Sequence, residues 1–157
     1  MVLKNIKKGD KNMEKFQEVK KIAKKCLKCQ NPLCVKGCPL NNPIPEILTL
    51  IENDNIVEAY NILFKNSNVP YICSNLCDKE KSCYGNCVLN KKQDAVPFYI
   101  VEEYLSSFYN EDKFEKPLTN NKNAIVIGSG VAGINASIML ALEGFNVTIV
   151  EKENIAL

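Results

Sequence analysis

The sequence predicts a mostly α-helical, cysteine-rich domain followed by the β-α-β start of an α/β domain. All eight cysteines fall between residues 26 and 87, and apolar residues recur at helical spacing around them. Residues 124–150 then read as strand, glycine-rich turn, helix and strand. The 157 residues suffice for one medium domain or two small ones. We place the helical domain at 1–112, a linker at 113–123 and the α/β unit at 124–157.

Four helices are expected in the helical domain. They span residues 13–27, 44–51, 56–65 and 97–109. Apolar residues of the first helix recur on one face, which we expect to be buried: Phe16, Val19, Ile22, Ala23 and Cys26. The many lysines of this helix indicate a solvated face, and the alternative is a docking surface for an acidic partner.

The basic residues narrow the range of functions. The chain has no histidine, and its 20 basic residues are all lysine. Without histidine there is no Ser–His or Cys–His catalytic pair and no mixed Cys/His zinc site. Without arginine there is no bidentate group for phosphate or guanine, and the net charge is only +2. We therefore predict no acid–base catalytic residue and no nucleic-acid partner.

The N-terminal segment and the cysteines together predict the cellular compartment. Residues 1–12 are lysine-rich without a long apolar run, so they do not resemble a secretory signal. No stretch reaches the roughly 18 apolar residues of a membrane span. We expect a cytoplasmic protein without a membrane partner, where clustered cysteines bind metal or do redox chemistry.

The spacing of the cysteines favours iron–sulfur clusters. The two groups read Cys26-x2-Cys29-x4-Cys34-x3-Cys38-Pro39 and Cys73-x3-Cys77-x5-Cys83-x3-Cys87. The first is close to the bacterial ferredoxin run, whose fourth cysteine, next to proline, ligates the other cluster. Pro39 biases Cys38 toward extended geometry, away from the pocket that the first three share. Two [4Fe–4S] clusters are predicted. The alternatives are two structural zinc ions, which usually need paired C-x2-C knuckles, and ordinary buried cysteines.

A glycine motif marks the second domain. It follows the strand at 124–127, opens a helix at 131–143 and precedes a strand at 146–150 that ends beside an acid. The candidate cofactor-binding residues at this turn and after the second strand are Gly128, Ser129, Gly130, Val131, Ala132, Gly133, Glu151 and Lys152. The Glu151 carboxylate can accept hydrogen bonds from a ribose and would repel a 2′-phosphate, which favours FAD or NAD(H) over NADP(H). The alternative is a packing turn.

Both motifs, in this order, resemble the small (beta) subunit of NADPH-dependent glutamate synthase and its relatives. The segments that carry the resemblance are residues 26–29 (CLKC), 32–39 (PLCVKGCP), 44–47 (IPEI), 69–73 (VPYIC) and 128–133 (GSGVAG). The resemblance implies an α-helical iron–sulfur domain and the start of a Rossmann-like FAD-binding domain. It also implies that this second domain is truncated at Leu157.

The resemblance further implies how the ligands divide. Cys26, Cys29 and Cys34 would share one cluster with Cys87. The second cluster would be held by Cys38, Cys77, Cys83 and a carboxylate, for which Glu102 is the candidate. Glu103 and Cys73 are the alternatives for this eighth ligand.

A function follows from the resemblance. The chain would relay electrons between a flavin and a large redox subunit or domain through two clusters. NAD(P)H would bind only in the part of the family's chain that follows residue 157. Two other functions stay open: a zinc-binding module that is not an enzyme, and an iron–sulfur adaptor that works without flavin.

Overall fold

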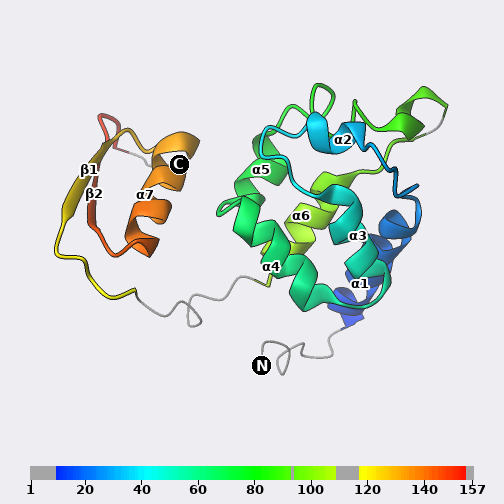
Figure 1. Cartoon of the computed structure of the whole chain (residues 1–157), viewed down its shortest axis with the longest axis horizontal. Coiled ribbons are helices and arrows are strands. Elements are labelled where there is room, and N and C mark those ends of the chain that lie inside the picture. The colour runs from blue at the N-terminus through cyan, green and yellow to red at the C-terminus, as the bar shows by residue number, and fades with distance from the viewer. Residues whose placement is uncertain (1–9, 93, 109–116, 155–157) are drawn as a thin grey trace. The chain divides into compact units, whose positions relative to one another are not determined.

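The chain forms two compact units, residues 1–109 and residues 110–157. Figure 1 shows them in a computed structural model, which describes residues 10–92, 94–108 and 117–154. The first unit is helical and the second is a β-α-β unit. The predicted fold class is therefore confirmed.

All four predicted helices are present in the first unit, with small differences in their bounds. In chain order they are α1 (Asp10–Lys24), α2 (Leu33–Lys36), α3 (Ile44–Glu52), α4 (Ile56–Asn66), α5 (Pro70–Leu76), the 3₁₀ turn η1 (Val88–Lys91) and α6 (Phe98–Ser106). The helix predicted at 13–27 ends three residues early, so Cys26 lies in the loop that follows α1. The helix predicted at 97–109 ends at Ser106, and Tyr109 lies outside the described residues.

Three short elements were not predicted. Two of them, α2 and η1, have four residues each, too few to show a helical period. A proline after a helical pattern commonly marks the end of that helix, but Pro70 occupies the first turn of α5. Proline suits that position because the first N–H groups of a helix have no partner inside it.

The helical unit has one apolar core. Helix α3 packs against α1 and α4, while α6 packs against α1, α4 and α5. The largest fully buried side chains include Ile47, Leu48, Leu63, Phe98 and Leu105. The predicted stripe of α1 belongs to this core: Val19, Ile22 and Ala23 are buried, and Phe16 and Cys26 are half-buried against it.

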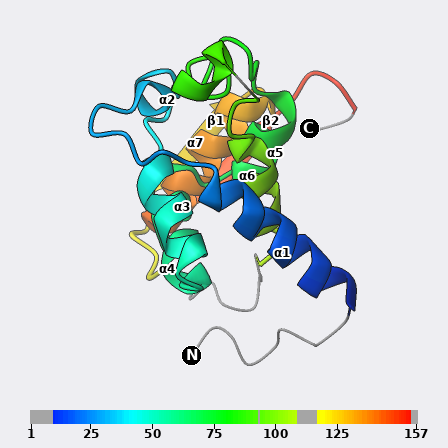
Figure 2. The same cartoon turned by 90° about the vertical axis from the view of Figure 1, so that its right-hand side faces the viewer.

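The cysteine-bearing segments lie at one end of the helical unit. Figures 1 and 2, which are related by a rotation about the vertical axis, both place α2 and the loop after α5 at the top. The longer helices α1, α3 and α4 extend away from this end in both views. Loops that lie more than 40 residues apart in sequence are therefore brought together.

The second unit consists of β1 (Asn123–Ile127), α7 (Val131–Leu142) and β2 (Asn146–Val150). The strands pair in parallel, from Asn123 opposite Asn146 to Ile127 opposite Val150. Helix α7 packs against both strands and ends just before Gly144, whose φ is +84°. Ile125 and Ile127 are largely exposed. The predicted linker at 113–123 lies partly outside the described residues. Among the described helices, none is long and apolar enough to cross a membrane.

Candidate metal centres and dinucleotide-binding turn

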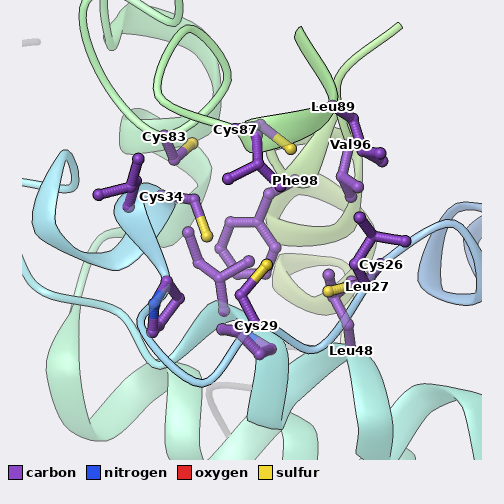
Figure 3. Close-up of a pocket in the computed structure, with 15 residues that line it drawn as sticks. Cys26, Leu27, Cys29, Cys34, Leu48, Cys83, Cys87, Leu89, Val96 and Phe98 are labelled. Atoms are coloured by element: carbon purple, nitrogen blue, oxygen red, sulfur yellow. The ribbon is translucent and has the colours of Figure 1, made fainter. Parts of the chain in front are cut away.

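Four cysteines from three segments surround one pocket. Cys26 and Cys29 come from the loop after α1, Cys34 from α2, and Cys87 from the residue before η1. Figure 3 shows the four sulfurs pointing into the pocket around the ring of Phe98. Besides these cysteines and Cys83, the lining is apolar and includes members of the core: Ile44, Leu48, Leu89, Val96 and Phe98. We call these four cysteines the first group.

Burial affects the protonation of two thiols in this group, Cys34 and Cys26. It raises the pKa of the Cys34 thiol to about 11, and the neighbouring Cys87 and Cys26 raise it further as like charges. Burial also raises the pKa of Cys26, with Cys29 and Cys87 adding to the effect. Without metal, the Cys34 and Cys26 thiols are therefore neutral at pH 7. A metal must displace their protons, as thiolate ligands always require.

A second set of acidic groups gathers around Cys83. Burial raises the pKa of Cys83 to about 12, and the next largest contributions come from Glu102, Cys38 and Cys77. Cys77 caps the C-terminus of α5, and Glu102 lies on α6. We call Cys38, Cys77, Cys83 and Glu102 the second group.

The neighbouring carboxylates Glu102 and Glu103 differ in environment. Glu102 is 7% exposed, and burial raises its pKa to about 7. Its Oε1 accepts a hydrogen bond from Asn42 Nδ2 at 3.1 Å. The Glu103 side chain is 44% exposed and forms an ion pair with Lys15 on α1, at 2.9 Å. Of the two, only Glu102 faces the cysteines.

Cys73 lies beside the second group but has a partner of its own. Its thiol is 3.6 Å from the hydroxyl of the buried Ser67, with which it is hydrogen-bonded. Burial raises its pKa, and Glu102, Cys77 and Cys38 act in the same direction. The Cys77 thiol similarly donates to Ser82 Oγ at 3.3 Å. Sequence reasoning did not single out Asn42, Ser67 or Ser82, because no motif spacing marks them.

The donor set fits iron–sulfur clusters. All eight cysteines are free thiols. The sulfurs of the first group surround a space with apolar walls. Within the described residues, no three cysteine or acidic side chains come close enough together to bind one metal ion. Each thiolate of a Cys₄ [4Fe–4S] site binds its own iron, so its ligands surround the cluster.

The glycine-rich turn joins β1 to α7. Gly128 has φ +97°, a conformation that side chains disfavour, and its N–H donates to Val150 O at 2.7 Å. Open space surrounds the place where a Cβ would stand on Gly130, which leaves room for a ligand to approach the backbone. A Cβ on Gly133 would lie 2.0 Å from Gly128 O, so the helix packs tightly on the turn. Val131 and Ala132 open α7.

Glu151 follows β2 and is bound to this turn. Its Oε2 accepts hydrogen bonds from Ser129 N at 2.6 Å and from Ser129 Oγ at 2.8 Å. The Ser129 N–H bond is the largest cause that lowers the pKa of Glu151 to about 2. The carboxylate is therefore ionised and fixed beside the helix N-terminus, where phosphates bind in dinucleotide folds. Lys152 is exposed and lies 3.5 Å from Glu153.

Comparison with known families accounts for both units. Residues 3–114 match the family described as dihydropyrimidine dehydrogenase domain II, 4Fe-4S cluster. The chain belongs to this family. Residues 123–156 match an FAD binding domain. The family and the FAD-domain match together cover nearly the whole chain.

Several proteins with curated names are similar to most of this chain. The glutamate synthase [NADPH] small chain of Halomonas elongata is 32% identical over 143 residues, which cover 88% of this chain and 30% of the relative. The corresponding protein of Escherichia coli is 29% identical, over 88% of this chain and 31% of the relative. The NAD-dependent dihydropyrimidine dehydrogenase subunit PreT of E. coli is 27% identical, over 85% and 33%. This chain thus spans about a third of the length of these relatives.

Proposed function

We propose that this chain is the electron-transfer part of an NAD(P)H-dependent oxidoreductase that resembles the glutamate synthase small subunit. It would relay electrons between FAD and a partner through two [4Fe–4S] clusters. The observation that supports the proposal is that Cys26, Cys29, Cys34 and Cys87 line one pocket, while Cys38, Cys77 and the buried Glu102 lie near Cys83. Each group draws on both halves of the cysteine sequence, as two interleaved clusters require.

The proposed ligands follow this division. Cys26, Cys29, Cys34 and Cys87 would hold the first cluster. The second would be held by Cys38, Cys77, Cys83 and Glu102. Cys34 belongs to α2 and Cys38 lies two residues after its end, so one short helix would connect the two sites. When bound, the clusters and the flavin supply the one- and two-electron chemistry. The chain's own residues bind, orient and shield them.

Residues 1–112 would then form the di-cluster domain, 113–123 the linker and 124–157 the start of the flavin domain. The turn from Gly128 to Gly133 would hold the FAD pyrophosphate, with Glu151 on the ribose. NAD(P)H would bind to another part of the complete protein. The protein would be located in the cytoplasm. The electrons would pass to a large redox subunit or domain. The names of the relatives support a partner of this kind.

One anaerobic preparation of the chain tests the proposal. We expect a brown protein with broad absorption at about 400 nm and about eight irons per chain, as two [4Fe–4S] clusters require. A colourless protein with stoichiometric zinc would overturn it and support the zinc module. An iron-loaded complete protein that never retains FAD would instead support the adaptor without flavin.

The eighth ligand needs a separate comparison of three variants. Glu102→Ala should change the electron paramagnetic resonance (EPR) signal of one reduced cluster, because it removes the buried carboxylate. Cys73→Ala and Glu103→Ala should leave both signals intact. The Glu103 variant is the matched control, since it removes a neighbouring carboxylate that pairs with Lys15. A change caused by Cys73→Ala alone would assign Cys73 as the ligand.

A further inference from the structure

Asn42 is a buried polar residue that the proposed ligand sets leave unused. It lies four residues after Cys38 and just before α3, and it is 0% exposed. Polar side chains are rarely buried so completely unless their hydrogen-bonding groups are satisfied. Asn42 therefore needs a physical reason.

The two polar atoms of the Asn42 amide differ in their hydrogen bonding. The Nδ2 group donates to Glu102 Oε1 at 3.1 Å. The Oδ1 atom has no hydrogen-bond partner among the described residues. A buried acceptor without a partner is unfavourable. Burial of Asn42 therefore leaves its acceptor Oδ1 without a hydrogen bond, while its donor Nδ2 is used to bind Glu102.

The choice of asparagine also fits the local charge. Cys38, Cys77 and Cys83 become thiolates when they bind metal. An aspartate at position 42 would add another negative charge beside Glu102 and these thiolates, whereas the neutral amide adds a donor and no charge. A leucine would fill a similar volume but offer no donor.

We infer that Asn42 is a positioning residue for Glu102 as a cluster ligand, an inference that rests on the proposed function. The amide holds Oε1 and so fixes the rotation of the carboxylate on α6. The second oxygen, Oε2, lies outside this hydrogen bond and is the atom that would reach the metal. Asn42 acts through Glu102 and does not itself bind the cluster.

The test compares variants of the 157-residue chain, loaded with iron and sulfide anaerobically. Asn42→Asp keeps the size but loses the donor, and Asn42→Leu removes both polar ends. Asn66→Asp is the matched control. The exposed Asn66 donates a hydrogen bond to the backbone carbonyl of Asn41, the residue before Asn42, and not to Glu102. Iron content, EPR of the reduced protein and helical circular dichroism are measured for each.

We expect both Asn42 variants to change the signal or iron occupancy of one cluster, the same one that Glu102→Ala alters. The helical signal and the other cluster should stay as in the parent, and Asn66→Asp should match the parent throughout. Adding Asn42→Leu to Glu102→Ala should cause no further change, because the amide would have nothing left to position. If Asn42→Leu loses its helical circular dichroism signal, and so does not fold, the result for Asn42→Asp alone tests the inference.

Three results would overturn the inference: unchanged spectra in both variants, an equal change in both clusters, or a further change on the Glu102→Ala background. Failure of the parent chain to take up iron would instead count against the proposed function. In that case the positioning role of Asn42 is tested by the carboxyl ¹³C resonance of Glu102 in the metal-free chain. It should shift in both Asn42 variants and not in Asn66→Asp, and an unshifted resonance would refute the positioning role.

Discussion

Substituting alanine for Gly37 should force apart the two cysteine-bearing segments. Gly37 lies between Cys34 and Cys38, and a Cβ at this position would stand 2.6 Å from Asn86 Nδ2 and 2.9 Å from Asn86 Cβ. Ordinary van der Waals contact between such atoms begins at about 3.5 Å, so the Asn86 side chain must move away by about 1 Å. Cys87 is the next residue, so its thiol moves away from the rest of the first group.

The structure also sets the size of the effect. Asn86 Nδ2 donates to Ser82 O at 2.8 Å and to Lys81 O at 3.1 Å, and the retreat strains or breaks both bonds. Each is worth about 1 kcal/mol net. Gly37 has φ −80°, which alanine adopts freely, so reduced chain entropy returns about 0.5 kcal/mol. The free energy of unfolding should fall by about 1.5 kcal/mol, which lowers the unfolding temperature by roughly 5–10 °C.

Thermal unfolding of the iron-loaded chain, followed by circular dichroism, measures this change, and iron content reports the displaced thiol. The control combines Gly37→Ala with Asn86→Gly, which removes the obstructing side chain. Relative to Asn86→Gly alone, the added alanine should be neutral or slightly stabilising. The reasoning is refuted if Gly37→Ala unfolds at or above the parent temperature, or if its effect is the same in both backgrounds.

Two further predictions concern the glycine-rich turn. Gly133→Ala should unfold the β-α-β unit, seen as loss of NMR dispersion for residues 117–154, because its Cβ would meet Gly128 O at 2.0 Å. Gly130→Ala, which meets only open space, is the control and should keep the dispersion. Glu151 has a pKa of about 2 against an ordinary 4.5, so its contribution to stability is complete above about pH 4.5 and is lost as pH falls toward 2. Ser129→Ala removes one donor and should move the Glu151 titration, followed by ¹³C NMR, part of the way back to 4.5; an unmoved titration would contradict this.

The longer elements could be predicted because their apolar residues keep a regular period. Helix α3 begins at Ile44 as predicted and ends one residue later than predicted, and α4 likewise extends one residue, to Asn66. The end of α1 was misplaced because Cys26 continues the apolar spacing although the chain has already left the helix. Helix α5 was missed because Pro70 also starts it, and proline alone does not say on which side of it a helix lies.

The candidate site was predictable only where spacing carries information. Cysteine spacing separates Cys38 from the first three cysteines, and the glycine motif marks the turn before α7. Asn42 has no such mark, since its role depends on a contact with Glu102, 60 residues away. The hydroxyls of Ser67 and Ser82 next to thiols also depend on how α5 and its following loop fold. Partners of this kind are set by tertiary packing, which the local sequence does not show.

The pocket of the first group shares its walls with the apolar core. Leu48 and Phe98 line it and are also among the largest fully buried side chains of the unit. Under the proposed assignment, a cluster bound here would lie directly against this interior, so its binding would be coupled to the stability of the whole helical unit. Loss of the cluster should therefore lower the free energy of unfolding of the entire unit, and not only loosen the cysteine-bearing loops.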